Sequence, residues 1–265
     1  MGEILKVEGL TKTFEKKSVF SSEKTIVKAA DDITFSLNSG EILAIAGESG
    51  SGKSTLAKLI LRAIDPDSGK IFFENEEISN KSTWKNIRMK CQMVYQDPYE
   101  SINPRMKIGK SIAEPMKVHG LFKGKQLDEK VCDLLNKVGL LPEHAERYPH
   151  EFSGGQRQRI CIARALGLEP RLIIADEAVS ALDVTIKAQI INLMMKLQED
   201  YGIAFLFISH DVAVVERISH RVAVMYLGRI VEIGTRKQIF ENPSHPYTKK
   251  LFNNPFDQLK DINVK

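Results

Sequence analysis

A glycine-rich stretch near residue 50 has the residue types and the spacing of a site that holds nucleotide phosphates. The pattern GxxxxGK[ST] is matched by the eight residues Gly47, Glu48, Ser49, Gly50, Ser51, Gly52, Lys53 and Ser54, and Thr55 follows directly. Glycines let backbone N–H groups converge on phosphate oxygens, and the N-terminus of a following helix adds positive potential. In this pattern Lys53 reaches the β and γ phosphates, and the Ser54 hydroxyl can bind Mg²⁺. We therefore expect ATP or GTP as the ligand.

A second group of chemically active residues follows another apolar run. Residues 172–175 are apolar, and Asp176 and Glu177 come directly after them. Asp176 can hold Mg²⁺ directly or through water, and Glu177 can orient and deprotonate an attacking water. The charge that develops on the γ-phosphoryl oxygens would be met by Lys53, Mg²⁺ and backbone donors. Two acids at the end of a strand are common in isolation, but the glycine-rich motif upstream favours the catalytic interpretation.

A third motif predicts a second anion site. Ser153 and the N–H groups of Gly154 and Gly155 precede a helical pattern that begins at Gln156. Backbone N–H groups at a helix start bind anions. Because the chain already has a phosphate cradle, a second one makes sense if it covers the nucleotide bound by another subunit. The alternative is an ordinary glycine-rich helix start.

The elements that must position these motifs alternate between strand and helix. Residues 42–46 read as a buried strand, and residues 55–64 place their apolar side chains on one helical face, so the glycines fall at a strand-to-helix turn. Further along, helices are predicted at 156–166, 184–201 and 211–218, with strands at 172–175 and 204–208 and a hairpin formed by 222–226 and 230–233. This alternation predicts parallel βαβ units.

The remaining segments predict two other kinds of structure. Residues 3–38 alternate apolar and polar positions, which predicts antiparallel strands, with the charged, Ser-rich residues 15–28 as a loop or an extended hairpin tip. A further strand is expected at 71–73. Residues 104–149 lose strand character and show helical periodicity, so we expect a helical insertion there.

Composition excludes several classes of protein. The 265 residues carry 38 Lys and Arg against 34 Asp and Glu, and the net charge of +4 is spread along the chain, so nothing marks a dedicated nucleic-acid surface. Cys91, Cys132 and Cys161 have no CxxC spacing, which argues against a disulfide framework and a zinc site and fits a reducing compartment. No leader pattern or bilayer-length apolar run is present, so a membrane role is expected to come through a partner.

Residues 152–159, FSGGQRQR, closely resemble the signature of ATP-binding-cassette (ABC) nucleotide-binding domains, and further motifs of that family occur in its order. Gln96 matches the Q-loop glutamine, which the resemblance implies contacts Mg²⁺ and water and links two subdomains. Residues 180–183 resemble the D-loop, which touches the opposite subunit, and His210 resembles the switch histidine on the γ-phosphate. For the aromatic side chain that stacks on adenine, the candidate is Phe14, with Phe20 as the alternative.

The resemblance implies the fold of the chain. It is an α/β fold, a P-loop NTPase ABC cassette with a RecA-like mixed-sheet core, an antiparallel β subdomain and an α-helical subdomain. All 265 residues are expected to form a single nucleotide-binding domain. Its parts are expected at about 3–98 and 160–235 for the catalytic core with the antiparallel part, about 99–159 for the helical subdomain, and about 236–265 for a C-terminal tail.

Two segments resemble one branch of the family. Residues 95–105 and 241–249 are similar to the corresponding segments of peptide and nickel importer ATPases, most of all the second ATPase of dipeptide and oligopeptide importers. The sequence departs from the family in having Ala178 where many members have Pro, which we expect to be harmless. It also lacks the Cys-bearing C-terminal extension of longer members, so no iron–sulfur cluster is predicted; nickel importer ATPases can be similarly short.

These observations lead to one expected function and its rivals. The resemblance implies an ATP-hydrolysing importer subunit, peripheral on the cytoplasmic face of the cell membrane. It is expected to pair head to tail with a second, non-identical ATPase beneath two permeases served by an extracytoplasmic binding protein. ATP would be held between Gly47–Thr55 of one subunit and Ser153–Gln156 of the other. Dipeptides or oligopeptides are the leading cargo, and nickel or a metal chelate is the alternative. A non-transport ABC ATPase fits the length of 265 residues less well, and a module without turnover would lack Glu177 or His210.

Overall fold

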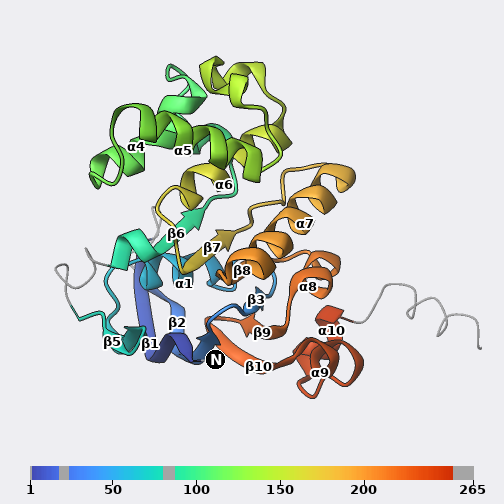
Figure 1. Cartoon of the computed structure of the whole chain (residues 1–265). Coiled ribbons are helices and arrows are strands. Elements are labelled where there is room, and N and C mark those ends of the chain that lie inside the picture. The colour runs from blue at the N-terminus through green and yellow to red at the C-terminus, as the bar shows by residue number, and fades with distance from the viewer. Residues whose placement is uncertain (1, 18–23, 80–86, 253–265) are drawn as a thin grey trace, which may run out of the picture.

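A six-stranded sheet forms the centre of the molecule (Figure 1). The computed structural model describes residues 2–17, 24–79 and 87–252, and all structural statements below concern these residues. The strands run in the order β10-β9-β3-β8-β7-β6. Their bounds are β3 Ile42–Ala46, β6 Cys91–Val94, β7 Leu172–Asp176, β8 Ala204–Ser209, β9 Arg221–Tyr226 and β10 Arg229–Thr235. All neighbours are parallel except β9 and β10, which confirms the predicted mixed sheet and its hairpin.

The central strands are buried on both faces, as parallel sheets require. Every residue of β3, β7 and β8 is buried. Alternate residues of β7 enter opposite cores: Ile173 packs with the helices that include α6, whereas Leu172 packs with the second sheet. The register pairs Ala46 with Ser209 and Asp176 with Ile208, so β3, β7 and β8 end at one edge of the sheet. Ligands of open α/β sheets bind at this edge, outside the carboxyl ends of the strands.

The second sheet is antiparallel and has the order β2-β1-β4-β5. Its strands are β1 Glu3–Lys17, β2 Lys24–Asn38, β4 Ser68–Phe73 and β5 Glu76–Glu77. The hairpin of β1 and β2 confirms the predicted antiparallel strands, but pairing continues from Glu15↔Ile26 to Lys17↔Lys24. The described part of the segment 15–28 is therefore an extended hairpin, one of the two predicted alternatives, because backbone pairing tolerates charged side chains on an exposed ribbon. Residues 18–23, including Phe20, lie outside the described residues.

Helices cover the central sheet and build the upper part of Figure 1. Their bounds are α1 Lys53–Ile60, α3 Pro98–Ser101, α4 Ile108–Val118, α5 Gly124–Lys137, α6 Gly154–Leu166, α7 Val184–Tyr201, α8 Val212–Ile218, α9 Arg236–Glu241 and α10 Pro246–Phe252, with short 3₁₀ helices η1 Pro142–Glu146 and η2 Pro149–Glu151. The elements α4, α5, η1 and η2 confirm the predicted helical insertion. Helix α7 has the predicted bounds, and α6 begins two residues before the predicted Gln156 because Ser153 caps it.

One apolar core joins the helical insertion to the sheet. Residues of α4, α5 and α6 pack in the same cluster as Phe205 and Phe207 of β8. Residues 236–252 are also ordered as α9 and α10, which lie beside β9 and β10 in Figure 1. Within residues 2–17, 24–79 and 87–252, no helix is both long and apolar enough to cross a lipid bilayer.

Candidate functional site

The predicted phosphate cradle is a strand–loop–helix unit. The loop leaves β3 at Ala46 and enters α1 at Lys53, with Gly52 as the residue before the helix. Gly52 has φ 107°, and a Cβ at this position would overlap the carbonyl oxygen of Ala29 in β2. Only glycine fits there, because the left-handed backbone and the close approach both exclude a side chain. The loop is thus held between its own helix and the antiparallel sheet.

Lys53 points back into this loop. Its Nζ donates to the carbonyl oxygens of Gly47 at 2.7 Å and Glu48 at 2.8 Å. Burial lowers the pKa of Lys53, while the nearby charges of Glu177 and Asp176 oppose that shift. An ammonium group has three donors. Two are used by the carbonyls, and the third makes a long contact of 3.4 Å with Ser51 Oγ, which a ligand such as a phosphate oxygen would replace.

A possible Mg²⁺ site is formed by oxygen donors from two elements. The Ser54 hydroxyl on α1 donates to Oδ1 of Asp176, at the end of β7, over 3.1 Å. Burial raises the pKa of Asp176, and the hydrogen bond from Ser54 opposes this shift. In the described part of the chain no group of three or more His, Cys, Asp or Glu residues could hold a metal. Mg²⁺ does not need such a group, since it keeps several waters and binds through one or two carboxylates plus phosphates. The donor set therefore fits Mg²⁺.

Gln96 lies on the same wall as these donors. It follows β6 and lines a cleft of about 620 Å³ together with Ser54 and Asp176. The three residues that the sequence predicts as metal ligands are thus brought to one surface, although they are separated by up to 122 positions.

Glu177 and His210 are brought together by neighbouring strands. Glu177 follows β7 and His210 follows β8, and Glu177 Oε1 lies 3.0 Å from His210 Nδ1. The backbone of Glu177 is left-handed, with φ 49°, and its N–H donates to the carbonyl of Ile208 at 2.9 Å. Non-glycine residues in this conformation are uncommon and cluster at functional sites. Here the conformation turns the carboxylate away from the sheet toward His210.

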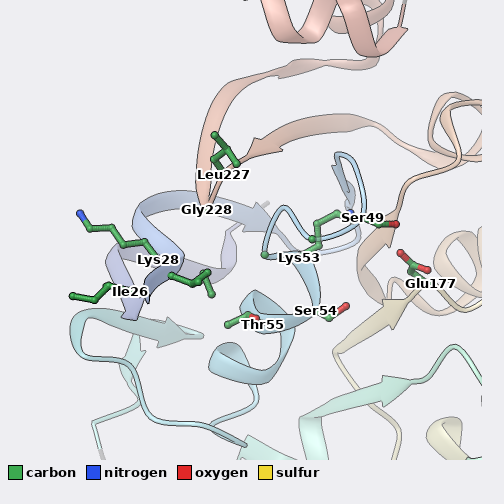
Figure 2. A pocket seen from close by; sticks show the side chains of 13 residues that line it. Ile26, Lys28, Ser49, Lys53, Ser54, Thr55, Glu177, Leu227 and Gly228 are labelled. Atoms are coloured by element: carbon green, nitrogen blue, oxygen red, sulfur yellow. The ribbon is translucent and has the colours of Figure 1, made fainter. Parts of the chain in front are cut away.

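The cleft beside the cradle measures about 560 Å³ (Figure 2). Lys53, Ser54 and Glu177 line it, and Ile26 and Lys28 of β2 lie on the side away from Glu177. Its remaining lining residues are Val27, Ala29, Ser49, Gly50, Gly52, Thr55, Leu227 and Gly228. Ser54 lines both this cleft and the one beside Gln96, so the two adjoin.

Phe14, the predicted adenine-stacking residue, is not among the residues that line the cleft. It is 41% exposed and pairs across strands with Val27, which does line it. Cross-strand partners have adjacent side chains on one face of a sheet, so Phe14 lies one position away from the cleft wall and stays a prediction. The wall residues Ile26, Val27 and Lys28 were missed by the sequence analysis. The sequence feature that could have indicated them is the pair of β-branched apolar residues Ile26 and Val27 inside a charged stretch.

The second anion motif forms the start of α6, where Ser153 and Gln156 cap the helix by two reciprocal hydrogen bonds. Ser153 Oγ accepts from the N–H of Gln156 at 3.3 Å, and Gln156 Oε1 accepts from the N–H of Ser153 at 3.0 Å. A Cβ on Gly155 would overlap Cγ2 of Ile186 on α7, which fixes how closely α6 and α7 approach. None of the residues Ser153–Gln156 lines either cleft described above. The motif is therefore present but not part of the cradle of its own chain.

Comparison with known proteins identifies the family. Residues 30–180 match the model of the ABC transporter family, and residues 231–260 match the oligopeptide/dipeptide transporter C-terminal region. The chain is 58% identical over 251 residues to the glutathione import ATP-binding protein GsiA of Escherichia coli K12, and equally to that of Shigella dysenteriae serotype 1. The match covers 94% of this chain but 40% of those proteins, so the chain spans less than half of their length.

Solved structures give the same family. The cbiO1 subunit from Clostridium perfringens, part of the transporter complex cbiONQ, superposes with TM-score 0.81 at 27% identity, covering 98% of this chain and 100% of that one. The ATP-binding cassette MJ0796, in a dimeric post-hydrolysis state bound to ADP and Pi, superposes with TM-score 0.76 at 27% identity over 88% of this chain and 99% of that one. With the phosphate cradle, the signature motif and the mixed sheet in place, this chain belongs to the ABC transporter family, as an ATP-binding cassette whose C-terminal segment is of the oligopeptide/dipeptide transporter type.

Proposed function

We propose that this chain binds and hydrolyses ATP as a subunit of an importer of dipeptides or oligopeptides. The observation that carries the proposal is that three sets of hydrogen-bonded or contacting groups lie at one edge of the sheet. Lys53 is held by the carbonyls of its own loop, Ser54 bonds to Asp176, and Glu177 lies against His210. Together they supply a phosphate cradle, oxygen donors for a metal and a carboxylate for activating water.

ATP would lie along the cleft of Figure 2. Its phosphates would be held by Gly47–Thr55, of which Ser49, Gly50 and the residues 52–55 line the cleft. Lys53 Nζ would exchange its long contact with Ser51 Oγ for a phosphate oxygen. The base would lie toward Ile26 and Val27, with Phe14 beside them as the stacking candidate. Mg²⁺ would be held by Ser54, Asp176 and Gln96 and would offset negative charge on the phosphates.

Glu177 is the proposed general base. Its side chain lines the cleft, and one carboxylate oxygen would accept a proton from the water that attacks the γ-phosphorus. The Nδ1 atom of His210 lies 3.0 Å from Glu177 Oε1. We propose that His210 orients this carboxylate and contacts the γ-phosphate. Ser180 Oγ donates to the Glu177 carbonyl at 3.0 Å and so ties the proposed D-loop to the same residue.

A complete site is proposed to need two subunits. Ser153–Gln156 carry a second helix start for anions but line neither cleft of their own chain. A head-to-tail dimer would bring this motif over the ATP on the other subunit. The dimeric state of the related cassette MJ0796 supports this arrangement. We propose a heterodimer with a second ABC ATPase, and no nucleic-acid partner.

The permeases are proposed to dock in a groove between the core and the helical part. It measures about 480 Å³ and runs between β6 and α4, close to the segment that bears Gln96. Val118 on α4 is 77% exposed, and Tyr95 beside Gln96 is 49% exposed. Apolar and aromatic side chains exposed in a concave surface fit a protein partner. The groove is lined by residues of both the proposed core, about 3–98 and 160–235, and the proposed helical subdomain, about 99–159.

The cargo is proposed from the comparisons. The glutathione import proteins and the oligopeptide/dipeptide C-terminal region both favour a peptide over nickel or a metal chelate, which stays the alternative. An importer would place this chain peripherally on the cytoplasmic face of the cell membrane, with two permeases and an extracytoplasmic binding protein as partners. The proposal includes no iron–sulfur cluster.

The ATP assignment is tested with the purified chain. Wild type should bind ATP in the presence of Mg²⁺ and release phosphate, whereas Lys53→Ala should lose affinity for ATP because the ammonium that meets the phosphates is gone. Lys237→Ala, which removes a 79% exposed side chain on α9, is the matched control and should bind like wild type. Unchanged ATP affinity of Lys53→Ala would contradict the cradle.

A further inference from the structure

The C-terminal helix α10 reaches the phosphate-binding loop through one side chain. The backbone N–H of Glu48 donates to the hydroxyl of Tyr247 at 3.1 Å, although the two residues are 199 positions apart. Tyr247 is only 9% exposed. Burial raises the pKa of its phenol, so the hydroxyl stays neutral at physiological pH. Nothing in the proposed reaction uses this contact.

The contact fixes the peptide group that also binds Lys53. The N–H of Glu48 and the carbonyl of Gly47 belong to one peptide unit, and in a trans peptide they point in opposite directions. The Gly47 carbonyl accepts from Lys53 Nζ at 2.7 Å. Tyr247 and Lys53 therefore hold opposite ends of the same peptide plane. Rotation of that plane would break both hydrogen bonds.

Tyr247 is itself held rigidly by the β9–β10 hairpin. Its ring packs on that of Tyr226, the last residue of β9, with centroids 4.1 Å apart. The Glu232 carboxylate on β10 accepts from the N–H groups of Ser244 at 2.7 Å and His245 at 3.0 Å. His245 Nδ1 in turn accepts from the N–H of Tyr247 at 3.1 Å. The start of α10 is thus anchored to the sheet before Tyr247 reaches the loop.

We propose that Tyr247 is a positioning residue of the nucleotide site: its hydroxyl fixes the Gly47–Glu48 peptide, and through that peptide it fixes the ammonium of Lys53. This inference rests on the proposed ATP site. It makes the C-terminal segment a part of the site rather than a tail. If the hydroxyl only fastened α10 to the body of the protein, it would affect stability and leave nucleotide affinity unchanged.

The test compares Tyr247→Phe with Tyr226→Phe in the full chain. Both variants lose one phenolic hydroxyl and keep the stacked rings, but of these two hydroxyls only that of Tyr247 hydrogen-bonds to the loop. We expect Tyr247→Phe to bind ATP and ADP about fivefold more weakly, the fold-change of one neutral hydrogen bond. Its KM for ATP should rise with little change in kcat, because Lys53 binds phosphate before and during the reaction. Tyr226→Phe should match wild type.

An NMR measurement separates this role from a general loss of structure. In ¹⁵N spectra, the Glu48 amide signal should move in Tyr247→Phe and stay in place in Tyr226→Phe. In wild type the Glu48 amide should be protected against hydrogen exchange, a test that needs no variant. An unprotected Glu48 amide, or equal ATP affinity in wild type and Tyr247→Phe, would overturn the inference while leaving the ATP site intact. Failure of wild type to bind ATP would instead contradict the proposed function.

Discussion

Glu177 and His210, 33 positions apart in the sequence, face each other across 3.0 Å at the ends of two neighbouring parallel strands. The register of β7 and β8 produces this contact, because Asp176 pairs with Ile208 and the chain leaves both strands at the same edge. The left-handed backbone of Glu177 then turns its side chain toward the histidine. We propose that a carboxylate held in this way takes a proton from water.

Glu177→Gln should separate binding from turnover. The amide keeps the size of the side chain but cannot accept the proton, so ATP should still bind while phosphate release falls by more than about 100-fold. A nucleotide-bound dimer should accumulate, which size-exclusion chromatography with labelled ATP would detect. Glu169→Gln is the matched control, since Glu169 also has positive φ, 51°, but lies in an exposed ion pair with Lys130. Near-normal hydrolysis by Glu177→Gln would remove Glu177 from the role of general base.

Gly155→Ala should destabilise the fold through the contact of α6 with α7. The added Cβ would overlap Cγ2 of Ile186, and overpacking of this kind costs about 1–3 kcal/mol. Gly154→Ala is the control at the preceding residue, where a Cβ would lie 3.5 Å from Leu182 Cδ2, an ordinary contact. Urea unfolding of both variants measures the difference in free energy. Equal stability of the two would show that the helices move apart without cost.

Much of the site could be predicted because its residues are adjacent in the sequence to strong strand patterns. The runs 42–46, 172–175 and 204–208 are apolar without interruption, and each is followed directly by residues of the candidate site. Parallel strands bring their carboxyl ends to one edge, so the meeting of Lys53, Asp176 and His210 follows from the pattern. The start of α6 was predicted two residues late, at Gln156, although Ser153 and Gln156 have the spacing of a capping box.

Contacts between distant, irregular segments could not be predicted in this way. The bond from Glu48 to Tyr247 depends on how the β9–β10 hairpin and α10 fold against the loop, and no periodic pattern encodes it. The wall formed by Ile26 and Val27 depends on how far the β1–β2 hairpin extends, and the charged residues there left a loop and an extended hairpin tip as alternatives. Whether Phe14 stacks on adenine stays a prediction: it pairs across strands with Val27 of the wall but does not itself line the cleft.

The three cysteines should differ sharply in reactivity. Burial raises the pKa of Cys91 to about 12 and that of Cys161 to about 11, so both stay protonated below those values. The thiolate is the reactive form. At pH 8 a thiol reagent should therefore react quickly only with the half-buried Cys132, and with all three after unfolding. Cys132→Ser should abolish the fast phase; two or more fast thiols in the native chain would contradict the buried positions.

The central claim is tested most directly by transport-coupled hydrolysis. The chain would be co-expressed with the second ATPase and the permeases of its proposed importer, and the complex would be reconstituted in lipid. Its ATP hydrolysis would be measured with a binding protein loaded with dipeptide and, separately, with Ni²⁺. We predict that the dipeptide-loaded protein stimulates ATP hydrolysis and that Glu177→Gln abolishes the stimulated rate. Stimulation by Ni²⁺ alone, or basal hydrolysis that neither loaded form changes, would contradict a peptide importer.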